Sequence, residues 1–206
     1  MSDIILIYQL KIFVLNGDVI TMRGSSHIVT GIATAAVLAD GYILLHAQPT
    51  ASVANNISVI VSDFMLKTEL PIFVHIPLCA ILYLFGLILP DIDHPYSIIG
   101  KIFYLPVQHR TWTHCWLPLL LAGIGSIWFR PLFFLGLGMF VHMFFDSFSA
   151  SGLNWFYPYK AKHVCGLYHT GQPTEYVFAT IFVLIAIIGS VFTLQYAYHI
   201  FDFFLR

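Results

Sequence analysis

Histidine and carboxylate side chains gather in one short stretch of this chain. Asp91, Asp93 and His94 stand almost together, and His109 and His114 follow soon after. Such a group of hydrogen-bond acceptors is costly beside apolar segments unless a cation lies among them. We therefore expect this stretch to bind a metal ion.

A second pair of the same residue types lies further along the chain. His142 and Asp146 are four positions apart, so a helix would present both side chains on one face. The alternative is a hydrogen-bonded His–Asp pair that joins two helices. His27 and Glu175 each stand at the beginning of an apolar segment. A single histidine in such a place is more often an interfacial polar residue than a ligand.

Charge and ligand number together indicate more than one ion. Four carboxylates beside five histidines would be neutralised by two divalent ions, and one ion needs only four to six ligands. Imidazole and carboxylate without thiolate favour zinc, with manganese or iron as alternatives. The three cysteines lack C-x-x-C spacing and predict neither a thiolate site nor a disulfide framework. The candidate metal ligands are His27, Asp91, Asp93, His94, His109, His114, His142, Asp146 and Glu175.

The composition is that of an integral membrane protein. Of 206 residues, 59% are hydrophobic and 9% are charged, whereas a soluble domain has about 25% charged residues. The net charge is −1 and no long basic run is present, so we expect no nucleic-acid binding through a charged face.

Five apolar segments predict an all-α, multi-pass membrane helix bundle. Residues 4–15 are apolar but too short for a span, and we expect residues 1–21 to form an interfacial helix or an extension. Residues 22–206 then form a single membrane-embedded domain. The predicted spans are residues 27–45, 72–89, 112–129, 131–148 and 176–196.

The candidate ligands stand alternately at the start and the end of successive predicted spans. Because successive spans run in opposite directions, all five positions face the same side of the membrane. We therefore predict a metal cluster at one membrane face. Six of the nine basic residues lie on that side, so the positive-inside rule places it in the cytoplasm of a bacterial inner membrane. The six are Lys11, Arg23, Lys101, Arg110, Lys160 and Lys162.

Two classes of function agree with this pattern. A metal pair activates water and binds the oxygens of a phosphoryl group, which predicts a hydrolase of a phosphoester such as a lipid headgroup. Arg110 would bind a phosphate oxygen, and we assign catalytic roles to Arg110 and Asp93. The alternative is a transporter or channel that conducts ions or protons through His and Asp. Because polar groups crowd one side, the enzyme is favoured. A metal-stabilised structural partner of another membrane protein is a third interpretation.

The combined motifs resemble the YdjM-type family, whose members are described as LexA-regulated, membrane-bound, metal-dependent hydrolases. The resemblance covers residues 22–176 and places the protein in the SOS response. The motifs are His27, Leu-Pro-Asp-Ile-Asp-His at 89–94, His-Arg-x-x-Thr-His at 109–114 and His142-x-x-x-Asp146-x-x-Ser149-x-x-Gly152.

That family is distantly similar to the zinc-dependent phospholipase C and single-strand nuclease superfamily. The superfamily's helical enzymes hold a cluster of zinc ions with His and Asp, including an H-x-x-x-D pair and a later acidic ligand. By this resemblance His142 and Asp146 are metal ligands and Glu175 is the later acidic ligand. The resemblance adds His27, Asp91 and His114 to the cluster.

Overall fold

The computed structural model describes residues 26–44, 70–159 and 165–198, so the interfacial helix expected in residues 1–21 lies outside the described residues. Within these ranges the protein is all-helical and has no named strand, as predicted. The elements are helix Ser26–Leu44, α3 (Ile72–Gly86), η1 (Leu89–Asp93), η2 (Trp112–His114), α4 (Trp116–Trp128), α5 (Leu132–Phe148) and α6 (Pro173–Tyr198), where η1 and η2 are short 3-10 helices.

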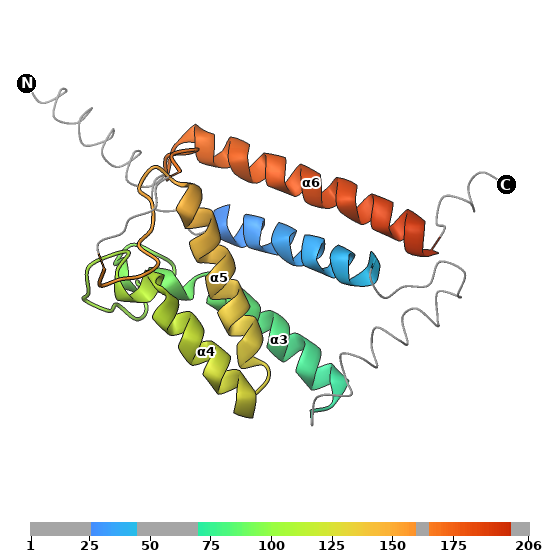
Figure 1. Ribbon diagram of the computed structural model, residues 1–206, viewed down its shortest axis with the longest axis horizontal. Helices are drawn as coiled ribbons and strands as arrows, with labels where there is room; N and C mark the ends of the chain where they lie inside the picture. The colour runs from blue at the N-terminus through green and yellow to red at the C-terminus, as the bar shows by residue number, and fades with distance from the viewer. Residues whose placement is uncertain (1–25, 45–69, 160–164, 199–206) are drawn as a thin grey trace, which may run out of the picture.

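Helix Ser26–Leu44 and α6 run side by side in the same direction (Figure 1). Ser26 donates a hydrogen bond to Glu175 at their beginnings, and Ser190 donates one to Asp40 further along, at 2.7 Å. The segments Ser26–Leu44 and Pro173–Tyr196 of these two helices, of 19 and 24 residues, are long and apolar enough to cross a membrane.

The other three helices are shorter than the predicted spans. α3, α4 and α5 have 15, 13 and 17 residues, whereas a span needs about 20. The prediction of about five spans is therefore not confirmed. The reason lies at the helix ends, because residues predicted to end or begin a span form η1 and η2 instead.

α3 and α5 approach each other closely through glycines. A Cβ atom on Gly86 would meet the backbone carbonyl of Leu135, and one on Gly138 would meet that of Tyr83. Beside this contact, Tyr83 donates a hydrogen bond to the carbonyl of Gly31 at 2.7 Å. This bond connects α3 to helix Ser26–Leu44.

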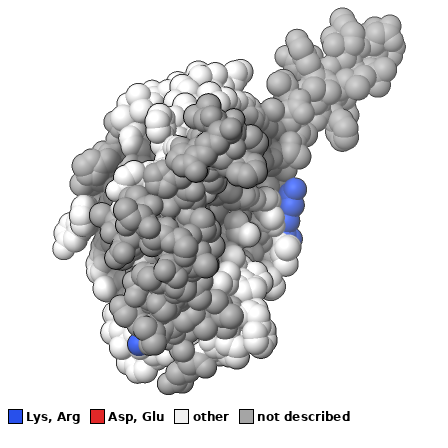
Figure 2. Space-filling view, turned by 90° about the vertical axis from the view of Figure 1, so that its right-hand side faces the viewer, with Lys and Arg blue, Asp and Glu red and all other residues white. Residues whose placement is uncertain are grey.

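The helix ends that carry the candidate ligands collect at one end of the molecule. Figure 1 shows helix Ser26–Leu44, α4 and α6 beginning there, and α3 and α5 ending there. Among the described residues on the face seen in Figure 2, Lys or Arg side chains are visible and no Asp or Glu side chain is. The fold thus collects the described candidate ligands at one end of the molecule.

Candidate metal centre

Four side-chain atoms, from Asp91 in η1, His114 in η2, and His142 and Asp146 in α5, are linked by His–carboxylate contacts; we call them the four-atom site. Nε2 of His114 lies 3.5 Å from Oδ1 of Asp91 and 3.6 Å from Oδ2 of Asp146. Nε2 of His142 lies 3.7 Å from each of the same two oxygens. Zinc bonds of about 2.0–2.2 Å place neighbouring ligand atoms of a tetrahedron about 3.3–3.6 Å apart. The four His–carboxylate separations of 3.5–3.7 Å are close to that spacing, which is compatible with one ion held among the four side chains.

Three of these atoms are buried without a hydrogen-bond partner among the described residues. They are Nε2 of His114, Nε2 of His142 and Oδ2 of Asp146. Each buried polar group left without a partner costs about 1–3 kcal/mol. One cation at the centre of the four-atom site would satisfy all three, so the residues present fit a divalent metal ion.

The orientation of His142 also suits a ligand. Its Nδ1 lies 2.7 Å from the carbonyl oxygen of Leu87, at the end of α3. A carbonyl oxygen only accepts hydrogen bonds, so Nδ1 is the nitrogen that carries the proton. The neutral ring therefore presents the lone pair of Nε2 to the four-atom site.

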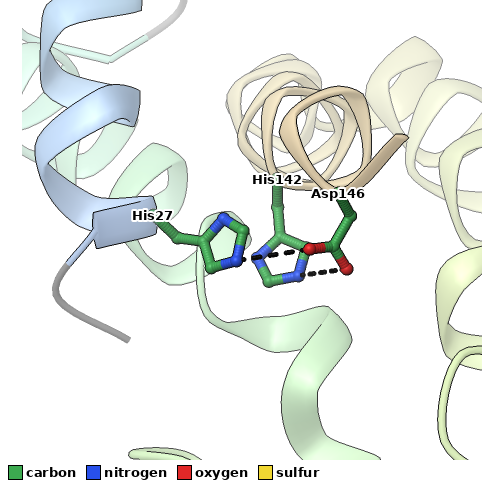
Figure 3. Close-up of side chains that lie close together, drawn as sticks. All are labelled: His27, His142 and Asp146. Atoms are coloured by element: carbon green, nitrogen blue, oxygen red, sulfur yellow. Dashed lines mark ion pairs between the residues drawn. The ribbon is translucent and has the colours of Figure 1, made fainter. Parts of the chain in front are cut away.

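Two further groups extend the capacity for metal binding. His27, His142 and Asp146 offer three atoms within 4.8 Å of one another, as do Asp91, His109 and His114. Figure 3 shows His27 facing His142 and Asp146 from the neighbouring helix, and Nε2 of His27 lies 3.4 Å from Oδ1 of Asp146. Asp146 thus presents Oδ2 to the four-atom site and Oδ1 to His27 and Arg110.

Asp93 lies beside the four-atom site rather than in it. Its Oδ1 lies 2.7 Å from Nδ1 of His109, and its Oδ2 accepts hydrogen bonds from Thr113 Oγ1 at 2.5 Å and from the backbone N–H of Arg110 at 3.1 Å. Burial would raise the pKa of Asp93, but hydrogen bonds from His109 and Thr113 and the nearby imidazole of His114, 3.6 Å away, hold it well below its usual range. Asp93 is therefore an ionised carboxylate that orients its neighbours, whereas its predicted role as a metal ligand or catalytic residue stays a prediction.

The guanidinium of Arg110 donates three hydrogen bonds to protein acceptors. It donates to Oδ1 of Asp146 at 3.1 Å, and to Ser149 Oγ and the Gly152 carbonyl at 3.0 Å each. Arg110 has a backbone φ of 60°, which is uncommon for a residue other than glycine. In this conformation its backbone N–H donates a hydrogen bond to Asp93. Arg110 thus positions Asp146, and phosphate binding by Arg110 stays a prediction.

Six of the nine candidate ligands lie in these groups, while Asp93, His94 and Glu175 lie around them. The ring of His94 is centred 5.0 Å from that of His109. The oxygens of Glu175 accept hydrogen bonds from Ser26 Oγ and from the backbone N–H of Gly171. Glu175 therefore joins two helix beginnings, and its predicted role as a metal ligand remains a prediction.

Two contributors to the site were not singled out by the sequence. Thr113 was noted only as part of a motif, although it stands directly before His114 and contacts Asp93. The Leu87 carbonyl is a backbone group, so its role cannot be predicted from the residue type. Only the packing of α3 against α5 could reveal it.

Without a metal ion, the raised pKa of His114 favours the protonated ring. Burial would lower the pKa of His114, but the carboxylates of Asp91 and Asp93 raise it to about 9. An ion that binds Nε2 must displace this proton, which couples metal binding to pH.

The comparisons with known proteins agree with the motifs. The family model of the YdjM inner membrane protein matches residues 22–201. The searches of curated proteins and of solved structures found no match. The family and the two long apolar helices support a membrane location. The chain belongs to the YdjM inner membrane protein family.

Proposed function

We propose that this protein is a membrane-bound, metal-dependent hydrolase that cleaves a phosphoester such as that of a lipid headgroup. The observation that carries the proposal is the four-atom site, in which three buried atoms lack a hydrogen-bond partner and converge on a fourth. The distant similarity of the motifs to zinc-dependent phospholipases C agrees with it.

Each residue has a defined task in this proposal. Asp91, His114, His142 and Asp146 would hold one divalent ion, and His27 and His109 would extend the set toward a second. Such ions supply an activated water and neutralise phosphoryl oxygens. Arg110 holds Asp146 in place through its guanidinium.

The exposed side of the cluster indicates where a substrate would enter. His114, His142 and Asp146 are almost fully buried, whereas the side chains of Asp91 and His109 are 16% and 35% exposed. A substrate would therefore approach from the side of Asp91 and His109.

The loop between His94 and His109 supports a lipid substrate. Two hydrogen bonds attach this loop to η1. The Leu105 N–H donates to the Ile92 carbonyl at 2.9 Å, and the Ser97 hydroxyl donates to the Asp91 carbonyl at 2.7 Å. The loop's apolar side chains point outward beside the entry. Contiguous exposed apolar residues mark membrane or partner contacts. The exposed ones are Tyr96, Ile98, Ile102, Phe103, Tyr104 and Leu105.

The alternative of an ion or proton path has less support. A path needs polar groups through the whole membrane thickness, and the described His and carboxylate groups of the cluster collect at one end. Asp40 is the described acidic residue furthest along helix Ser26–Leu44, and its carboxylate accepts a hydrogen bond from Ser190. This pair is explained by the association of the two long helices.

The test is to purify the full-length protein in detergent, measure bound metal, and assay hydrolysis of phospholipids and of a chromogenic phosphodiester. We expect bound zinc or manganese and metal-dependent hydrolysis in the wild type. His142→Ala and Asp146→Asn should lose both, because each removes a buried ligand of the four-atom site. His169→Ala, which changes an exposed histidine outside the groups, is the matched control. Full metal content in both ligand variants, or metal without hydrolysis of any phosphoester, would contradict the proposal.

A further inference from the structure

The hydroxyl of Thr113 lies between a buried carboxylate and a buried imidazole. Thr113 Oγ1 lies 2.5 Å from Oδ2 of Asp93 and 2.9 Å from Nδ1 of His114. All three side chains are buried, with Thr113 the most exposed at 8%. Water therefore has little access to this line of three groups.

The directions of the two hydrogen bonds follow from their chemistry. An ionised carboxylate only accepts, so the single hydroxyl proton of Thr113 is donated to Asp93. The oxygen of Thr113 must then accept from the other side, where the donor is the Nδ1–H of His114. In the neutral ring, which is the form that can bind a metal ion, Nδ1 carries the proton and the lone pair of Nε2 faces Asp91 and Asp146.

We propose that Thr113 is a positioning residue that fixes the tautomer and ring orientation of His114 through a relay from Asp93. The inference deepens the proposed function, because it rests on His114 being a metal ligand. The partner of the other ring nitrogen sets which nitrogen of a histidine binds metal, and removing such a partner typically costs about 10- to 100-fold in metal affinity.

His142 is held in the same tautomer by a backbone group instead of a side chain. Its Nδ1 donates to the Leu87 carbonyl, which no side-chain substitution can remove. The orientation of His114 depends on the Thr113 hydroxyl and the Asp93 carboxylate. Replacing that hydroxyl with a methyl group therefore tests this dependence. The relay thus gives the site a side chain that can be changed without touching a ligand.

The experiment compares Thr113→Val, which keeps the shape and removes the hydroxyl, with Thr113→Ser, which keeps the hydroxyl. Zinc affinity is measured by competition with a chelator, and the visible spectrum of the cobalt-substituted protein reports the ligand geometry. We expect Thr113→Val to bind zinc about 10- to 100-fold more weakly with an altered cobalt spectrum. Thr113→Ser should restore both. Thr34→Val is the control, because the Thr34 hydroxyl donates to a carbonyl of its own helix, that of Thr30.

A second measurement separates this inference from the proposed function. In metal-free protein with labelled histidine, the hydrogen-bonded Nδ1 proton of His114 should give a low-field signal in wild type and Thr113→Ser. Thr113→Val should lose it, and Thr113→Ala serves if the valine variant does not fold. A wild type that binds no metal but shows this pattern contradicts the proposed function and keeps the relay. The relay is wrong if Thr113→Val keeps the signal and the affinity, or if Thr113→Ser loses them as well.

Discussion

The carbonyl oxygen of Leu87 and Nδ1 of His142 lie 2.7 Å apart, so the end of α3 orients a side chain of α5. This contact exists because Gly86 and Gly138 let the two helices approach closely. The close packing of α3 against α5 therefore also sets the orientation of His142, a candidate ligand. A substitution distant from the ligands should disturb the site through it.

Gly138→Ala should lower both thermal stability and metal affinity. The new methyl group would meet the Tyr83 carbonyl and push α3 away from α5. Overpacking of this kind costs about 1–3 kcal/mol of stability, and His142 would lose its oriented partner. Thermal unfolding and zinc titration of the detergent-solubilised protein measure the two effects.

Gly123→Ala in α4 is the matched control, because a Cβ atom there meets nothing within 4 Å. This variant should keep the wild-type melting temperature and metal affinity. If Gly138→Ala instead matches Gly123→Ala in both measurements, close helix approach does not orient His142.

Arg110→Lys should weaken metal binding although the positive charge remains. The guanidinium bonds Asp146, Ser149 and the Gly152 carbonyl together, which a single ammonium group cannot do in the same geometry. We expect a decrease of about 10-fold in zinc affinity, at the lower limit for loss of such a supporting contact. Chelator competition measures it, with Arg130→Lys in the exposed turn before α5 as the control. Unchanged zinc affinity would mean that Arg110 does not position Asp146.

Metal affinity should rise with pH between about 7 and 9. In the metal-free protein the pKa of His114 is raised to about 9, so the ring is protonated at neutral pH. A metal ion must displace this proton, and lowering the pH therefore opposes binding. Zinc titration in weakly buffered solution at pH 7 should release protons. An affinity that does not change from pH 7 to pH 9 would remove His114 from the ligand set.

The metal cluster should face the cytoplasm and the carboxyl terminus the opposite side. Helix Ser26–Leu44 and α6 both begin at the cluster, so each would leave that side if it spans the membrane. The excess of basic residues on the cluster side gives the direction. A reporter active only outside the cytoplasm should be active after Arg206 and inactive after Tyr159. The reverse pattern would invert the orientation.

The local patterns of the sequence predicted what depends on short-range geometry. The apolar segments predicted helices, and the spacing of His142 and Asp146 predicted one helical face, because the helix repeats every 3.6 residues wherever it forms. The combined motifs predicted the family. Composition predicted a membrane protein, since long apolar segments with few charges are stable in the hydrocarbon core of a bilayer.

Tertiary structure decided which candidates meet. Asp91 and His142 come from segments far apart in the chain, and their contact depends on the glycine packing of α3 against α5. Helix length was likewise decided there, because α3 ends at Gly86, before the predicted end at residue 89, and η2 forms where the third predicted span would begin. Hydrogen bonds to Asp93 from His109 and Thr113, and to Asp146 from Arg110, join positions that no helical or strand period connects. Their directions and distances exist only once the chain has folded.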